Sequence, residues 1–314
     1  MMRRLLLAVL AATALVGAAA GCGGGSTSTK PPPPLPASLA AVFRYDRSAQ
    51  GDRPLHDVKV VNQGYPVKVH DVWYEGPGHD RIDGYLMVPP GKGPFAGVVF
   101  VPGAGGTRDS WLVDAADVAA RGAVTFALST PFIESQPTPG GLGPIYQYRI
   151  GFTQSVLDLR RALDLLATRP GVDPKRLGIV GHSLGGGVVA ATAGVDKRPA
   201  AVVVMAPVGR AHFYPPLSSE LQAEANQDLR SVVPTTYVRY AHAALLLALA
   251  KHDDVIPDSE YAAYQASVPD GTTVRRYDTG HSFSQSSVSD MLDWLGDELH
   301  LGPLPKYAQH LVAG

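Results

Sequence analysis

The chain has 314 residues, of which 45% are apolar and 18% charged, a balance typical of a folded globular protein and not of a disordered one. Its formal net charge of −1 offers no basic field for phosphates, which argues against a nucleic-acid partner. Its single cysteine excludes an intramolecular disulfide, and no cysteine–histidine cluster has the spacing of zinc ligands.

The first 21 residues have the pattern of a secretory signal peptide. Residues 1–4 form a short basic start. Residues 5–20 form an apolar run that is too short, and has side chains too small, for a membrane-spanning helix. The run ends in Ala-Ala-Gly-Cys at residues 19–22, which resembles the lipobox of bacterial lipoproteins, although that family more often has Leu in place of Ala19. The resemblance implies lipidation of Cys22 and anchoring on the extracytoplasmic face of the cell membrane. The alternative is cleavage near Ala20 and free secretion.

Residues 22–38 are predicted to form a tether. Their first half is rich in Gly, Ser and Thr and is expected to be flexible, whereas the proline-rich second half forms a stiffer spacer. Neither half has the apolar residues to bury a core. The sequence therefore predicts one folded domain over residues 39–314, held away from a membrane by this tether.

The first half of that domain reads as the edge and centre of a sheet. Residues 65–75 and 81–88 predict an antiparallel hairpin at a sheet edge, while residues 39–63 carry no clear pattern. Residues 95–101 are continuously apolar, as in a parallel strand buried on both faces. A helix over 110–121 and a buried strand over 123–128 are expected to follow.

A long helix and a long loop come next. Residues 129–148 read as a loop that leaves the end of a parallel strand, where open α/β sheets bind ligands. Residues 152–168 predict a helix, because apolar residues recur every three or four positions. Four charged residues lie off that apolar stripe, and we interpret them as a solvated face of the helix: Asp158, Arg160, Arg161 and Asp164.

The second half of the domain alternates strands with helices. An insertion at about residues 207–240, with a helix over 218–229, interrupts the alternation. The expected strands are 176–180, 200–206, 243–250 and 272–277, and the expected helices are 186–193, 259–267 and 287–300. This alternation predicts an α/β protein with a mostly parallel sheet covered by helices on both faces.

One short motif stands out at the end of the strand over residues 176–180. The run Gly181-His182-Ser183-Leu184-Gly185 reads G-x-S-x-G between a strand and a helix of small residues. In that setting the turn forces the serine into a strained conformation and exposes its hydroxyl as a nucleophile. The alternative is an ordinary glycine-rich turn.

A serine nucleophile needs a base, and the base needs an orienting acid. The order nucleophile, acid, histidine is that of α/β-hydrolases, with each residue on a loop after a strand. Asp253 and Asp254 compete for the acid. Asp253 is preferred because it is nearer the strand end and because the run up to Pro257 resembles the D-x-x-[VI]-P stretch common after this strand in α/β-hydrolases. His281, in Gly-His-Ser-Phe just past the last strand, has the right place for the base.

An acyl-transfer site also needs donors for the developing oxyanion. The amide of Leu184 directly follows the nucleophile, and we expect it to supply one donor. The amide of Ala104, in the Pro-Gly-Ala-Gly-Gly loop at residues 102–106, is the best candidate for the second. The alternative for this loop is a flexible glycine turn without a catalytic role.

From about Asp83 to Leu299 the chain resembles the dienelactone-hydrolase-like group of α/β-hydrolases. The stretch over residues 172–186 is its most specific part. Two features depart from the pattern: many relatives have His-Gly where this chain has Pro102 and Gly103, and dienelactone hydrolases proper use a cysteine nucleophile. The resemblance implies the α/β-hydrolase fold with an eight-stranded type of sheet, and an esterase-like activity that requires no cofactor and no metal.

The activity expected from these residues is hydrolysis of a small-molecule or polymeric carboxylic ester. Thioesterase, acyltransferase and peptidase activities stay open because they use the same chemistry, and a non-catalytic binding lipoprotein or a structural cell-envelope protein is a more distant alternative. Five aromatic residues could line an apolar cleft or could be ordinary packing: Trp111, Phe132, Tyr146, Phe213 and Tyr214.

Overall fold

The structure is a computed structural model that describes residues 31–51, 53–61, 64–135, 145–209, 218–303 and 305–306. The predicted signal peptide, Cys22 and the first part of the tether lie outside the described residues. Within the part of the chain that is described, no helix combines the length and the apolar character needed to cross a membrane.

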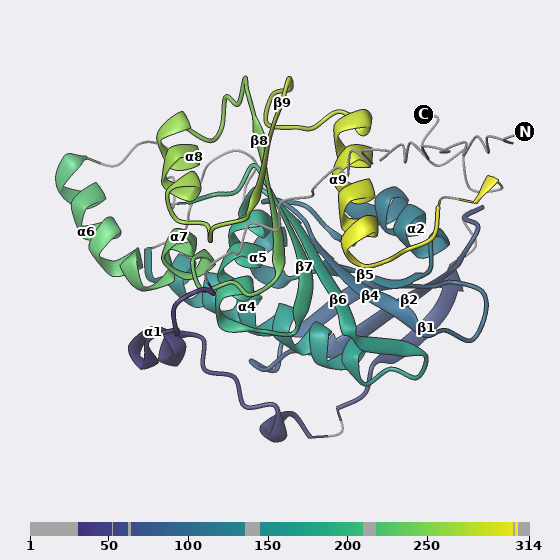
Figure 1. The fold of residues 1–314 in the computed structure, drawn as a ribbon. Helices are drawn as coiled ribbons and strands as arrows, with labels where there is room; N and C mark the ends of the chain where they lie inside the picture. The colour runs from purple at the N-terminus through teal and green to yellow at the C-terminus, as the bar shows by residue number, and fades with distance from the viewer. Residues whose placement is uncertain are drawn as a thin grey trace, which may run out of the picture.

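Among the described residues, nine strands form one sheet at the centre of the fold, in the order β1-β2-β3-β5-β4-β6-β7-β8-β9 (Figure 1). The strands from β5 to β9 in that order pair in parallel, and β1, β2 and β3 pair antiparallel. Their bounds are β1 His56–Val61, β2 Lys68–Glu75, β3 Arg81–Val88, β4 Phe95–Val101, β5 Ala123–Ser129, β6 Val172–His182, β7 Pro199–Met205, β8 Ala244–Ala250 and β9 Thr273–Tyr277.

The expected α/β class and the mostly parallel sheet are confirmed. The predicted hairpin is also present, with β2 and β3 paired from Lys68 opposite Val88 to Glu75 opposite Arg81. It does not lie at the edge of the sheet, because β1 pairs with β2 outside it and brings the strand count to nine. Strand β1 was not predicted, because its central residues are exposed, Val58 and Val60 among them, and the strand therefore lacks a buried alternating face.

Helices cover both faces of this sheet (Figure 1). One face packs against α2 (Leu112–Ala120) and α9 (Gln285–Glu298), and the other against α4 (Ile145–Ala167), α5 (Leu184–Val195), α7 (Pro234–Val238) and α8 (Asp258–Gln265). Successive residues of β4 serve the two faces alternately: Val99 and Val101 lie in the core of the α4–α5 face, and Val98 and Phe100 in that of the α2–α9 face.

The charged residues of α4 correct one expectation. The structure buries Asp158, Arg161 and Asp164, so they do not form a solvated face. Asp164 accepts hydrogen bonds from the hydroxyl of Tyr45 and from the guanidinium of Arg198. Asp164 is thus paired inside the protein, and the segment that follows the tether covers it, a contact between distant parts of the chain that the helix pattern alone cannot reveal.

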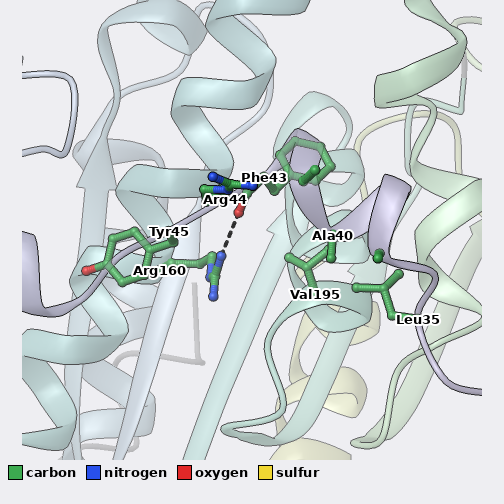
Figure 2. A pocket seen from close by; sticks show the side chains of 9 residues that line it. Leu35, Ala40, Phe43, Arg44, Tyr45, Arg160 and Val195 are labelled. Carbon is green, nitrogen blue, oxygen red and sulfur yellow. Dashed lines mark hydrogen bonds between the residues drawn. The ribbon is translucent and has the colours of Figure 1, made fainter.

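That N-terminal segment begins with α1 (Ala37–Val42), which starts inside the predicted tether. Figure 2 shows the segment beside α4, where Arg160 donates to the carbonyl oxygen of Phe43 over 2.8 Å. The Phe43 side chain is 1% exposed, and its ring meets the ring of Tyr237 edge-on with centroids 4.8 Å apart. The segment is therefore packed as part of the folded body.

The two long connections contain short helices. The first holds α3 (Pro131–Glu134) and leads into α4, which begins earlier than expected, at Ile145; residues 136–144 lie outside the described residues. The second holds α6 (Ser219–Leu229) and α7, and its residues 210–217 are likewise outside the description. Both connections follow the carboxyl ends of parallel strands, β5 and β7, the edge at which ligands bind in open α/β sheets.

Candidate active site

The sharp turn between β6 and α5 presents Ser183. Its backbone has φ 55° and ψ −117°, a conformation that residues other than glycine rarely adopt. The turn is tight: a Cβ at Gly181 would lie 2.3 Å from the carbonyl oxygen of Gly185, and one at Gly185 would lie 2.3 Å from that of Pro102. Only glycine at these two positions lets the strand, the helix and the loop after β4 approach so closely.

His281 lies within hydrogen-bonding distance of that serine. Its Nε2 is 2.9 Å from the Oγ of Ser183, and its Nδ1 is 2.9 Å from the Oδ2 of Asp253. A carboxylate only accepts, so Nδ1 carries the proton and Nε2 presents its lone pair to the serine hydroxyl. The imidazole is thus held in the tautomer that can accept a proton from Ser183.

Besides His281, three other groups donate hydrogen bonds to the carboxylate of Asp253. The backbone amides of Val255 and Ile256 each donate to its Oδ1 over 2.8 Å, and the hydroxyl of Tyr261 donates to its Oδ2. Burial alone would raise the pKa of Asp253, but the hydrogen bonds from Tyr261, Ile256, His281 and Val255 outweigh it and hold the pKa below its ordinary value. The side chain is therefore an ionised acceptor in a fixed orientation.

The geometry distinguishes the two competing acids. Asp253 is the carboxylate that contacts His281, whereas Asp254 is exposed. The turn explains the difference, because the amides two and three residues after Asp253 close onto its own side chain. Asp254 points away from this closed turn into solvent.

His182 has a structural role that its place in the sequence did not indicate. Its Nε2 donates to the backbone carbonyl oxygen of His281 over 2.9 Å, and the two rings lie 4.8 Å apart. Burial, and then the proximity of His281, lowers the pKa of His182 to about 4. A neutral imidazole thus ties the serine turn to the loop that carries His281.

The two expected oxyanion donors lie beside the serine. Leu184 is the first residue of α5, so its amide has no partner within the helix. In the loop after β4, the amides of Gly105 and Gly106 already donate to backbone carbonyls over 2.8 and 2.9 Å. The loop touches the turn, since a Cβ at Gly103 would lie 3.2 Å from the Cβ of Ser183. Ala104 lies between these positions, which leaves its amide as a candidate donor.

The aromatic residues proposed for a cleft have different surroundings. Trp111 is 5% exposed and packs on Phe100 in the core of the α2–α9 face. Phe132, on α3, is partly buried and meets the ring of Tyr148 edge-on at 5.5 Å. The side chain of Tyr146 and all of Phe213 and Tyr214 lie outside the described residues.

Taken together, Ser183, His281 and Asp253 form one hydrogen-bonded chain at the carboxyl ends of β6, β8 and β9. Such a chain can remove a proton from a serine hydroxyl as it attacks an acyl carbon. Among the described residues, no group of three or more His, Cys, Asp or Glu side chains is arranged to hold a metal ion.

Comparison with known proteins agrees with this architecture. Residues 98–231 match the model of the alpha/beta hydrolase family. Similar solved structures include an acetyl xylan esterase from Paenibacillus sp. R4, with a TM-score of 0.69 and 22% identity over 85% of this chain and 96% of that one. Acetyl xylan esterase 1 from Thermoanaerobacterium sp. JW/SL YS485 has a TM-score of 0.66 and 17% identity over 84% and 95%.

A protein described as a dienelactone hydrolase, from Klebsiella pneumoniae subsp. pneumoniae MGH 78578, has a TM-score of 0.54 and 17% identity over 70% of this chain and 93% of that one. At such identities the likeness establishes a shared fold and leaves the substrate open. By the order of its strands, by these structural neighbours and by the family model that its central segment matches, the chain has the α/β-hydrolase fold.

Proposed function

We propose that the protein is a serine hydrolase that cleaves carboxylic esters through an acyl-enzyme intermediate. The observation that carries this proposal is the position of the His281 imidazole, 2.9 Å from the hydroxyl oxygen of Ser183 on one side and 2.9 Å from the carboxylate of Asp253 on the other. A base held between a nucleophile and an ionised acid is the arrangement that serine acyl transfer requires.

The proposed reaction has two halves. In the first, Ser183 attacks the carbonyl carbon while His281 takes the hydroxyl proton, and His281 then gives that proton to the departing alcohol. In the second, His281 takes a proton from water, which attacks the acyl-enzyme and releases the acid. Asp253 keeps the imidazole in the productive tautomer and stabilises its positive charge. Neither half needs a metal or a cofactor.

The amides of Leu184 and Ala104 are the proposed donors to the oxyanion. The amide of Leu184 is free of intrahelical bonding, and the loop that carries Ala104 lies against Ser183 through Gly103. Donors fixed before the reaction stabilise the negative charge without having to reorganise. Loss of one such donor typically slows acyl transfer on the order of 100-fold or more.

The substrate class is the least constrained part of the proposal. Two structural neighbours are named as acetyl xylan esterases, which supports a short acyl group on a sugar or polymer as the first class to test. Thioesters, amides and acyl transfer to another acceptor use the same residues and stay open.

Hydrolysis of matched substrates tests this function. We would compare p-nitrophenyl acetate, butyrate and octanoate, acetylated xylo-oligosaccharides, an acyl thioester and a p-nitroanilide, with Ser183→Ala as the control. Turnover of esters that Ser183→Ala abolishes supports the proposal. Preference for the thioester or the anilide would move the assignment to thioesterase or peptidase, and a folded protein without turnover would favour a binding role.

We also propose that the mature protein is anchored in the membrane by a lipid on Cys22, with its active site on the extracytoplasmic side. The support is the sequence of residues 1–22 alone, with the only cysteine of the chain at the position that lipidation would use. Mass analysis of the mature N-terminus, with Cys22→Ser as the control, tests it. An unmodified N-terminus near Gly21 and release into the medium would indicate simple secretion.

A further inference from the structure

The oxygen of Asp253 nearest to His281 also accepts a hydrogen bond from a second side chain. Oδ2 lies 2.9 Å from the Nδ1 of His281 and also accepts the hydroxyl hydrogen of Tyr261. Oδ1 lies slightly farther from Nδ1, at 3.1 Å, and accepts from two backbone amides. Oδ2 is thus shared by the imidazole and a phenol.

Tyr261 is built into this position. It lies on the short helix α8, its side chain is 0% exposed, and its ring belongs to the core of the α4–α5 face. Burial, and then the hydrogen bond to Asp253, raises the pKa of Tyr261 far above its ordinary value. The hydroxyl therefore keeps its proton at neutral pH and acts as a permanent donor.

We propose that Tyr261 is a positioning residue of the active site, which fixes the Oδ2 of Asp253 and moderates the pull of that carboxylate on His281. This inference rests on the proposed function of Ser183, His281 and Asp253. A hydrogen bond to a carboxylate draws off part of its negative charge, so the imidazolium beside it is stabilised less. Tyr261 thereby weakens the support that Asp253 gives to a positive charge on His281.

Other titratable groups lie around Tyr261, Asp253 and His281 on several elements. His182 approaches from the end of β6 and becomes charged only near pH 4. Asp258, at the start of α8, acts on Tyr261 and lies 3.9 Å from Arg276 of β9. His252 and Asp254, on the same loop as the acid, are exposed, so solvent screens them. Substitution of the Tyr261 hydroxyl leaves all of these groups in place.

The test is Tyr261→Phe in the full chain, which removes one hydroxyl and keeps the buried ring. We expect the plateau of kcat/KM to fall about 3- to 10-fold, because one hydrogen bond no longer orients the acid. We also expect the acidic limb of the pH profile to move up by roughly half to one pH unit. A purely structural role would leave this limb in place.

Tyr237→Phe is the matched control. Tyr237 is also 0% exposed, and its hydroxyl donates to the backbone carbonyl oxygen of Ser231 over 2.6 Å, on α7 and away from the acid. It should lose a similar buried hydrogen bond without moving the acidic limb. The proposal would be overturned if the acidic limb of the pH profile lay at the same pH in wild type and Tyr261→Phe. It would also be overturned if the limb moved equally in Tyr261→Phe and Tyr237→Phe.

A second readout needs no substrate, and it separates this inference from the proposed function. The proton on the Nδ1 of His281 should give a low-field NMR signal that is lost in His281→Gln, and in Tyr261→Phe it should move further downfield as Asp253 becomes a stronger acceptor. An unmoved signal contradicts the inference even in an active enzyme. Wild-type protein without turnover or labelling contradicts the proposed function, while the NMR comparison still decides the inference.

If urea unfolding shows that the Tyr261→Phe variant does not fold, the test uses wild-type protein carrying 3-fluorotyrosine instead. The fluorinated phenol is a stronger donor, so the acidic limb should move to lower pH and the Nδ1 signal upfield. Movement in the opposite direction, or none, would count against Tyr261.

Discussion

The imidazole of His182 donates from Nε2 to the backbone carbonyl oxygen of His281 over 2.9 Å, so the residue before Ser183 holds the loop that carries His281. The serine turn and the histidine loop come from the ends of β6 and β9, which are not neighbours in the sheet. This hydrogen bond fixes the separation of Ser183 and His281 directly, where the strands alone would set it only loosely.

Replacement of His182 should therefore impair the reaction of Ser183. His182→Leu leaves the His281 carbonyl without this donor, and we expect a loss of about 1–2 kcal/mol of stability. A displaced base slows attack, so labelling by a fluorophosphonate should fall by roughly 10- to 100-fold. His182→Gln keeps an amide donor within reach and should retain more activity. Equal labelling rates for wild type and His182→Leu would contradict this account.

The low pKa of His182 makes a pH-dependent contribution to stability. Its pKa is about 4 in the folded protein, below the value of about 6.5 for an unperturbed histidine. Between these values the unfolded chain binds a proton that the folded chain excludes. The contribution is complete above pH 6.5 and is lost as the pH falls towards 4, by about 3 kcal/mol at most.

Urea unfolding at pH 7.5, 6, 5 and 4 measures that contribution. The difference in stability between wild type and His182→Gln should shrink steadily towards acid, because glutamine does not titrate. The difference isolates His182 from the other groups that titrate in the same range. Two curves that stay parallel from pH 7.5 to 4 would show that His182 does not titrate as the structure implies.

The two adjacent acids should behave very differently. Asp253→Asn removes the charge that stabilises the imidazolium and can reverse the tautomer of His281, and the equivalent change in serine proteases costs about 10⁴-fold in kcat. Asp254→Asn changes an exposed side chain and should keep kcat within about 2-fold. Steady-state hydrolysis of one ester by both variants makes the comparison. A larger loss of kcat in Asp254→Asn than in Asp253→Asn would show that the assignment of the acid to Asp253 is wrong.

The glycine two residues after Ser183 offers a test of the turn itself. Gly185→Ala places a Cβ 2.3 Å from the carbonyl oxygen of Pro102, a backbone atom that cannot rotate away. We expect the helix α5 to shift, with a loss of labelling and of several kcal/mol of stability. Gly296→Ala is the control, since its Cβ would meet nothing nearer than 3.8 Å within α9 and should be neutral or stabilising. Normal labelling of Gly185→Ala would show that the turn does not need glycine there.

Much of this architecture was predictable because it depends on local pattern. The buried strand over residues 95–101 reads directly from its apolar run, and the structure has β4 over the same residues. Ser183, Asp253 and His281 each follow a predicted strand, so their meeting at one edge followed from the parallel order of the sheet. The structure adds their distances, which no pattern in the sequence contains.

What the sequence could not predict depends on contacts between distant segments. Asp164 and Arg161 of α4 look like surface charges in the helix pattern, but the segment around Tyr45 covers them, more than a hundred residues away in the chain. The hydroxyl of Tyr261 and the imidazole of His182 bind partners that the fold alone brings near them, through the positions of β8, β9 and α8. Polar side chains that support others leave no periodic signal of their own.

The central claim is that Ser183 is an activated nucleophile, and the most direct test is covalent labelling. The full chain would be treated with a fluorophosphonate at pH 7.5 and its intact mass measured, followed by peptide mapping, beside Ser183→Ala and His281→Gln. We predict a single adduct on Ser183, none in Ser183→Ala, and a rate at least about 100-fold lower in His281→Gln. A folded protein that forms no adduct, or one that is labelled equally in Ser183→Ala, would contradict the claim.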